Sequence, residues 1–246
     1  MQSETALVTL KEYLDSVAPQ YEYGTFWKRY VAKCGEFISP KVEGKHVLEM
    51  GCSTLVVSEM LASIARTFEI VEGAETFAQK ANNHFGDRVA VHHALFEEFS
   101  PSQPFEAIVF TNTLHHVLEP ESVLKRIRNW LVPDGLLYVT VPNMRSLHRR
   151  LGVKMELLPD VFASTTRNEI FQQNGRYTKE SLISLCTSCG YRVNECFTFF
   201  LKPFSDEQME RLTPSDELVD ALFEMGRELD DLGCLIYAEL SPDRAK

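Results

Sequence analysis

Short apolar runs alternate with amphipathic stretches between residues 46 and 141. Buried strands are predicted from these runs at 46–50, 67–71, 89–92, 107–111 and 136–141. Between them, helical spacing of apolar residues begins near Ser58, Glu75 and Glu121. Such alternation is typical of a mostly parallel sheet with helices on both faces, so we predict an α/β fold of the doubly wound class.

The C-terminal part of the chain has a different pattern. Its predicted elements are a helix at 179–189, a long strand at 191–201, acidic helices within 205–231 and a last strand at 234–240. No crossover of the earlier βα kind joins the two strands. We therefore expect them to form an antiparallel edge of the sheet.

Two segments, 1–40 and 142–178, lie outside this alternation. Ligands of open α/β sheets bind beyond the carboxyl ends of the strands, so we predict that both segments act as lids, with 142–178 on the substrate side. The first segment contains an aromatic cluster of Tyr21, Tyr23, Phe26, Trp27 and Tyr30. No repeat or Gly/Ser-rich linker divides the chain, and we expect one domain over residues 1–246.

Charge and composition restrict the classes of ligand and partner that the protein can bind. Lys and Arg number 25 against 35 Asp and Glu, and the formal charge of −10 argues against binding to a nucleic-acid backbone. A basic stretch from Arg145 to Lys154 is compatible either with a small anionic ligand or with a solvated surface. No run is long and apolar enough for a membrane span, and the first residues lack the pattern of a secretion signal, so we expect a cytoplasmic protein without membrane contacts.

The six cysteines predict buried, reduced thiols. Cys186 and Cys189 form a CxxC pair, but it lies within helical apolar spacing and no second Cys or His pair follows nearby. We expect no metal.

The strongest local motif joins the first predicted strand to the helix after it. In HVLEMGCSTL, the strand ends at Glu49 and Met50, and Gly51 begins the turn. A turn of this kind presents backbone N–H groups and a helix N-terminus to an anionic group. The second strand ends at Glu72, where a carboxylate can reach the two hydroxyls of a ribose. The motif predicts nucleoside binding, and the alternative is a tight turn with a surface glutamate.

At this point the sequence resembles the class I S-adenosylmethionine-dependent methyltransferases, from about Tyr21 to Leu240. The segments that match are VLEMGC, IVEG, HHALFEEFSPSQPFEAIVFTNTLHHVLEP and GLLYVTVPNMRSLHRRLGV. Later stretches, RYTKESL and FFLKPFSDEQME, look like a bacterial branch that accompanies glycan or natural-product pathways. The resemblance implies a Rossmann-like, seven-stranded, mostly parallel sheet with antiparallel last strands, and S-adenosylmethionine (SAM) as ligand.

The resemblance also assigns residues to parts of the cofactor. It places Glu49 and Gly51 near the methionine end, Glu72 on the ribose, Leu95 and Phe96 around the adenine, and Asn112 to His116 along the cleft. In the aromatic cluster, Tyr21 is a candidate for contact with the sulfonium, because aromatic faces attract cations. A place in the core is the alternative for most of that cluster.

The glycine turn departs from the family pattern GxGxG. Gly51 is retained, but Ser53 and Leu55 stand where glycines are usual. Glycine suits such sites because a Cβ obstructs close approach of the ligand and because φ can be positive. Ser53 can offer its hydroxyl to the cofactor carboxylate, and Leu55 must turn its side chain away or reshape the pocket.

Four residues are candidates for catalysis. His115 and His116 follow the fourth strand and could accept a proton from the acceptor, although packing roles fit them equally well. Asn143 follows the fifth strand, and Tyr177 precedes a helix for which Thr178 is a plausible N-cap. An amide oxygen and a phenol there could hold an amino or hydroxyl nucleophile, and loop structure is the alternative.

Three functions remain open. The first is methyl transfer from SAM to oxygen or nitrogen of a small molecule. The second consumes SAM alone: its α-amine displaces methylthioadenosine and closes an azetidine ring, a hypothesis that the altered turn and the Asn143/Tyr177 pair suggest. The third is a non-catalytic regulator that binds SAM, suggested by the two missing glycines.

Overall fold

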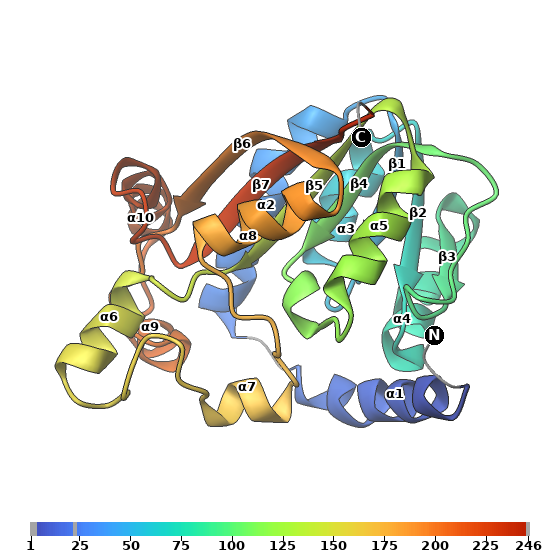
Figure 1. Ribbon diagram of the computed structural model, residues 1–246. Helices are drawn as coiled ribbons and strands as arrows, with labels where there is room; N and C mark the ends of the chain where they lie inside the picture. Colours follow the sequence, from blue (N-terminus) through green and yellow to red (C-terminus); the bar gives the residue numbers. More distant parts are fainter. Residues whose placement is uncertain (1–3, 22–23, 245–246) are drawn as a thin grey trace.

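Seven strands form one sheet in the computed structural model, which describes residues 4–21 and 24–244 (Figure 1). The strands are β1 (His46–Met50), β2 (Thr67–Glu72), β3 (Ala90–His93), β4 (Phe105–Thr111), β5 (Leu131–Pro142), β6 (Tyr191–Phe199) and β7 (Leu235–Pro242). Their order is β3-β2-β1-β4-β5-β7-β6. The first five are parallel, and β7 runs antiparallel to both β5 and β6. The predicted Rossmann-like sheet with reversed last strands is confirmed.

Helices cover both faces of this sheet. They are α1 (Glu4–Val17), α2 (Thr25–Val42), α3 (Val56–Ile64), α4 (Glu75–Phe85), α5 (Pro120–Trp130), α6 (Leu147–Lys154), α7 (Thr166–Ile170), α8 (Lys179–Ser188), α9 (Asp206–Leu212) and α10 (Asp216–Glu228). Three-residue 3₁₀ turns lie at η1 (Ala18–Gln20), η2 (Gly86–Arg88) and η3 (Leu114–His116). None of the helices in the described part of the chain combines the length and apolar content that a membrane crossing requires.

Two apolar cores lie on opposite sides of the sheet. One joins α2, α3 and α10 to the strands and includes Ile38, Leu61 and Phe223. The other packs α5 and α8 against the strands, with Leu124 and Leu182 fully buried. Figure 1 shows α5 and α8 in front of the sheet and α2 and α3 behind it. The strands are read as continuous apolar runs because both faces of the sheet are buried.

The parallel register brings the ends of neighbouring strands to one edge. Met50 of β1 pairs with Val71 of β2, so the residues that follow them, Gly51 and Glu72, are neighbours. The Gly51 N–H donates to the Val71 carbonyl at 2.9 Å and closes the turn. The predicted N-cap is also observed, because the Thr178 side chain accepts the Ser181 N–H at the start of α8.

Candidate functional site

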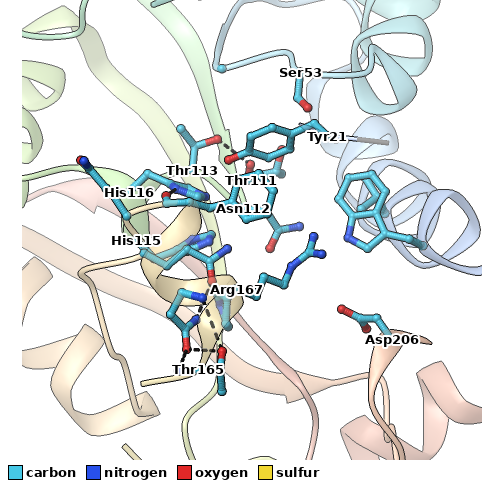
Figure 2. Close-up of a pocket in the computed structure, with 18 of the residues that line it drawn as sticks. Tyr21, Ser53, Thr111, Asn112, Thr113, His115, His116, Thr165, Arg167 and Asp206 are labelled. Atoms are coloured by element: carbon cyan, nitrogen blue, oxygen red, sulfur yellow. Dashed lines mark hydrogen bonds between the residues drawn. The ribbon is translucent and has the colours of Figure 1, made fainter. Parts of the chain in front are cut away.

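A cavity of about 770 Å³ opens beyond the carboxyl ends of β1, β2, β4 and β5. Its lining comes from α1, the turn after β1, the ends of β2 and β4, the segment after β5 and the start of α9. Figure 2 shows its centre, with His115 and His116 on one side and Ser53 and Tyr21 above. The volume lies within the range of about 300–1,000 Å³ that is usual for small-molecule sites.

The turn after β1 keeps its shape with only one glycine. Gly51 has a φ of 81°, and a Cβ there would lie 2.9 Å from the Thr113 side chain. Ser53 and Leu55 also have positive φ, 43° and 71°, which costs about 1–2 kcal/mol for a residue with a side chain. Leu55 is buried in the core and outside the lining, whereas the buried Ser53 hydroxyl lines the cavity without a hydrogen-bond partner among the described residues.

Glu72 holds this turn from the end of β2. Its Oε2 accepts the N–H of Cys52 at 2.9 Å and that of Ser53 at 3.4 Å, and its Oε1 accepts the Ala74 N–H at 2.9 Å. Burial raises the pKa of Glu72, and the backbone N–H groups offset part of that rise. Because each carboxylate oxygen has two lone pairs, Oε2 is used by the turn and Oε1 retains one for a ligand hydroxyl.

Two further polar groups of the lining lack partners within the part of the chain that the structure describes. They are the Glu49 Oε2 and the Asn112 Nδ2. Glu49 is 1% exposed, and burial together with the charge of Glu72 raises its pKa to about 8. An unpaired buried polar atom costs about 1–3 kcal/mol, so their position beside Ser53 indicates a polar ligand.

An apolar wall faces these polar groups. Leu95 is buried and Phe96 is partly buried, and both line the cavity. Tyr21 packs edge-on against Phe171 with ring centroids 4.4 Å apart and against Phe77 at 5.8 Å. These rings offer a flat, apolar site for a base or a sulfonium.

The aromatic cluster that contains Tyr21 is divided between the cavity and the core. Trp27 and Tyr30 line the cavity, while Phe26 is 2% exposed and packs in the core. Tyr23 lies outside the described residues.

Both candidate histidines belong to the lining. The His116 Nδ1 lies 2.8 Å from the Phe171 carbonyl, which can only accept, so Nδ1 carries the proton and Nε2 of the neutral ring is an acceptor. Burial lowers the pKa of His116 to about 4. Burial also lowers the pKa of His115 far below its usual range, and its Nδ1 has no partner among the described residues. Both rings therefore stay neutral at pH 7.

Asn143 lines the cavity, but its side-chain amide is fully engaged elsewhere. Its Nδ2 donates to the carbonyls of Asp231 at 3.0 Å and Gly233 at 2.8 Å, and its Oδ1 accepts the Arg145 N–H at 2.9 Å. The amide thus joins the segment after β5 to the turn before β7. These contacts are those of a structural brace.

Tyr177 lies beside Asn143 along the backbone, through an isolated β-bridge. Its side chain is 7% exposed, packs in the core on the α5 and α8 side and is not part of the cavity lining. Burial raises its pKa to about 12. The backbones of Asn143 and Tyr177 are therefore paired, but of the two side chains only that of Asn143 lies along the cavity.

The two segments predicted as lids contact each other over the cavity. The Tyr13 hydroxyl of α1 donates to the Ile170 carbonyl of α7 at 2.5 Å, and Figure 1 shows the two helices end to end along the lower edge. Leu10 and Leu14 of α1 line the cavity on the same side.

The basic stretch after β5 reaches the cavity only in part. Arg145, Arg150 and Lys154 are exposed and outside the lining, whereas Arg149 lines the cavity. Arg167 of α7 lines it too. Of the basic side chains in the predicted stretch, that of Arg149 is therefore the one that faces the cavity.

Sequence reasoning missed a partly buried ion pair in the lining. Lys202 is 6% exposed and pairs with Asp206, the first residue of α9. The available signal was a single lysine within the apolar stretch FFLKPF, four residues before an acid. Within the described residues, no group of three or more His, Cys, Asp or Glu side chains is arranged to hold a metal.

Comparison with known proteins agrees with this geometry. A family described as a methyltransferase domain matches residues 20–195, more than half of the chain. The chain belongs to this methyltransferase family. Its order of strands is that expected of the class I, SAM-dependent branch, although its turn keeps one of the three usual glycines.

Curated relatives of this methyltransferase include ubiquinone biosynthesis O-methyltransferases. The protein from Glaesserella parasuis is 26% identical over 109 residues, 41% of this chain and 46% of the relative. The mitochondrial protein from Bos taurus is 22% identical over 172 residues, 67% of this chain and 46% of the relative. The chain spans about half the length of the curated relatives it matches.

Solved structures show the same fold at low identity. The methyltransferase CcbJ from Streptomyces caelestis superposes with a TM-score of 0.63 at 15% identity, covering 94% of this chain and 97% of that chain. The N-methyltransferase NodS from Bradyrhizobium japonicum, in complex with S-adenosylhomocysteine (SAH), gives a TM-score of 0.59 at 13% identity, with 96% and 97% covered.

We expect Asn143→Ala to lower the free energy of unfolding by about 1–3 kcal/mol, because it leaves the Asp231 and Gly233 carbonyls without their donor. Urea unfolding measures the loss, and Asn82→Ala, at an exposed position of α4, is the control. Unchanged stability together with a large loss of kcat would instead make Asn143 catalytic.

Proposed function

We propose that this methyltransferase transfers a methyl group from SAM to an oxygen or nitrogen atom of a small acceptor. One observation carries the proposal: the buried, unpartnered polar atoms of Glu49, Ser53 and Asn112 line one cavity beside the carboxylate of Glu72. A ligand with an amino acid end and a ribose supplies partners for all of them. SAM has both parts, and the family and the fold also favour SAM as the ligand.

We expect the residues of the cavity to bind the parts of SAM as follows. The Glu49 carboxylate suits the α-ammonium group, and the Ser53 hydroxyl suits the α-carboxylate. The Glu72 Oε1 accepts a ribose hydroxyl, and Leu95 and Phe96 cover the adenine. Asn112 remains to orient the methionine chain or the acceptor.

SAM, when bound, supplies a methyl group bonded to a sulfonium sulfur. The neutral thioether that remains, SAH, is a good leaving group. The protein must hold the acceptor in line, which can contribute about 7–11 kcal/mol to lowering the barrier. His116 fits the role of proton acceptor, because its Nδ1 bond to Phe171 leaves Nε2 unprotonated. A positioned base contributes about 10²- to 10⁴-fold when its pKa lies near the working pH, and less at the pKa of about 4 that burial gives His116.

The other two functions have less support. The amide of Asn143 is used in the fold and the Tyr177 side chain is outside the lining, so the pair that motivated the azetidine-forming reaction gains nothing from these contacts. The regulator hypothesis relied on the missing glycines, and the turn closes without them.

A mass-spectrometric assay separates the three functions. Purified protein is incubated with SAM alone and with pools of small phenols, amines and acids. We expect SAH and a methylated product only when an acceptor is present, and loss of most activity in His116→Gln. Many turnovers of methylthioadenosine without an acceptor would establish the cyclase, and SAM binding without any product would support the regulator.

A second prediction concerns Glu72 and the ribose. Wild-type protein should bind SAH about 10- to 150-fold more tightly than its 2′-deoxy analogue, as expected for a hydrogen bond to a charged group worth about 1.5–3 kcal/mol. Glu72→Gln should reduce this ratio toward one. Calorimetry measures the four affinities, and this cycle removes the effect of Glu72 on the turn itself. An equal ratio in both proteins would contradict the assignment to the ribose.

A third prediction concerns the proton on Glu49. Because its pKa is raised to about 8 by burial, Glu49 is mostly protonated at pH 7 in the free protein. The ammonium group of SAM favours the ionised carboxylate and lowers that pKa, so binding should release close to one proton at pH 7. At pH 9 Glu49 is already mostly ionised, while the α-amine of free SAM, with a reference pKa of about 8, is mostly neutral, so binding should instead take up close to one proton. Calorimetry in two buffers of different ionisation enthalpy counts the protons. Glu49→Gln should release none, and equal release from both proteins would exclude Glu49 as the source.

A further inference from the structure

Five of the large apolar side chains that are exposed in the described part of the chain line the cavity. Met155 and Leu157 are the most open of them, with 65% and 71% of their surfaces exposed. Single exposed apolar side chains are ordinary, whereas a group of them at the mouth of a cavity marks a surface that a ligand covers. The group consists of Leu118, Leu151, Met155, Leu157 and Phe204.

One face of α6 carries most of this apolar surface. Along α6 and its C-cap, the residues that line the cavity include His148, Leu151, Gly152 and Met155. Spacings of three and four residues put these positions on the same side of a helix, so that side is turned toward the cavity. We call His148, Leu151, Met155 and the following Leu157 the α6 face.

Backbone hydrogen bonds fix the exposed part of the α6 face. The Leu157 N–H donates to the Gly152 carbonyl at 2.9 Å, so the chain turns back onto α6 as soon as the helix ends. Farther along, the Arg149 side chain donates to the carbonyls of Val161 at 2.6 Å and Ala163 at 2.5 Å. Both ends of the turn are thus tied to α6, and Leu157 is held in its exposed position by ordered backbone.

The α6 face changes from apolar to polar at its inner end. The His148 Nδ1 is buried without a hydrogen-bond partner among the described residues. Burial and the positive charge of Lys202 lower the pKa of His148 to about 3, so the ring is neutral and offers one donor and one acceptor. A ligand on this face therefore meets a hydrogen-bonding group at one end and an apolar surface at the other.

The order of strands places the α6 face on the acceptor side of the cavity. Glu49 lies in β1 and Glu72 ends β2, and both are assigned to SAM. His116 follows β4, and α6 follows β5, the next strand of the sheet. Figure 1 shows α6, after β5, and α4, after β2, on opposite sides of the molecule. The lining thus runs from the cofactor groups past the candidate base to the α6 face.

We propose that the acceptor is an amphiphilic molecule, whose apolar ring or chain lies along Leu151, Met155 and Leu157 and whose polar end points inward past His148. This proposal rests on the proposed function and names its substrate class. Covering the α6 face removes apolar surface from water, and the gain is proportional to the area covered. The inward orientation of the polar end brings the nucleophilic atom to the side of the cavity where His116 lies.

Position within the cavity identifies this occupant. The α6 face and His116 belong to the lining of one cavity of about 770 Å³. A molecule that reaches the His148 Nδ1 must enter this cavity, because that atom is buried. The surface of a second copy of the chain would cover the rim and leave the polar atom unpaired, whereas an elongated small molecule meets both.

A homologous series of 4-alkylphenols tests the proposal without knowledge of the acceptor. The ethyl, butyl and hexyl members are titrated into protein with and without saturating SAH, and calorimetry measures each affinity. We expect binding to tighten by about two- to fourfold for each added methylene, the upper value being that of a fully buried CH₂ group. Affinity that does not depend on chain length in the wild type would overturn the proposal.

A pair of matched variants locates the chain. Leu157→Gln should weaken the binding of 4-hexylphenol by about three- to tenfold and that of 4-ethylphenol by less than about twofold, because only the longer chain reaches the outer part of the face. Leu212→Gln is the control, since Leu212 is 58% exposed and lies outside the cavity lining. It should leave all three affinities unchanged, and an equal loss in both variants would contradict the placement on the α6 face.

Two further measurements separate the acceptor from other occupants of the α6 face. Sedimentation at several protein concentrations and binding to phosphatidylcholine vesicles are compared between the wild type and Leu157→Gln, and we expect no difference in either. A dimer that the variant dissociates, or vesicle binding that it abolishes, would assign the face to a second copy or to a membrane and overturn the proposal. Failure to bind SAH would count against the proposed function instead, since the phenols are also titrated without it.

Discussion

The candidate site depends on one carboxylate that accepts hydrogen bonds from the turn beside it. Glu72 binds the N–H groups of Cys52, Ser53 and Ala74 and so connects the ends of β1 and β2. Ser53 and Leu55 carry positive φ without being glycines, and a turn of this kind needs support from outside to persist. Hydrogen bonds to a buried charge are strong enough to give that support. The same geometry leaves one lone pair on the Glu72 Oε1, so the group that shapes the turn is also the one proposed to bind the ribose.

A second connection runs through Phe171, the residue that follows α7. The Phe171 carbonyl sets the tautomer of His116, its ring lies against the Arg167 guanidinium, and Tyr21 packs edge-on against the same ring. The candidate base, the Arg167 guanidinium and the aromatic wall therefore share one support. A shift of α7 would change all three together. The hydrogen bond from Tyr13 to Ile170 connects α1 directly to α7 and so to these three groups.

Periodicity predicts the fold because burial on two faces leaves a local pattern in every strand. Gly51 and Glu72 were found for a related reason: each follows a recognisable strand, and parallel strands place their ends together. Side chains whose surroundings come from distant segments could not be read in this way. The Asn143 amide binds a carbonyl of the turn before β7, and the Tyr177 side chain packs in the core. Lys202 lines the cavity from the segment after β6. Spacing alone suggested catalytic roles for Asn143 and Tyr177 and did not single out Lys202.

Net charge and the charge inside the cavity act over different distances. The exposed carboxylates of α10 contribute to the formal charge of −10, but at physiological ionic strength their field decays over about 8 Å. Arg167 and the buried Lys202 act at contact, where screening is weak and desolvation strengthens the attraction. An extended polyanion would meet the acidic surface along its length, whereas a small ligand meets only the groups of the cavity. These groups carry both signs, because the cations Arg149, Arg167 and Lys202 share the lining with five carboxylates. The charge that a small ligand meets is therefore set by its position in the cavity and not by the net charge of the chain.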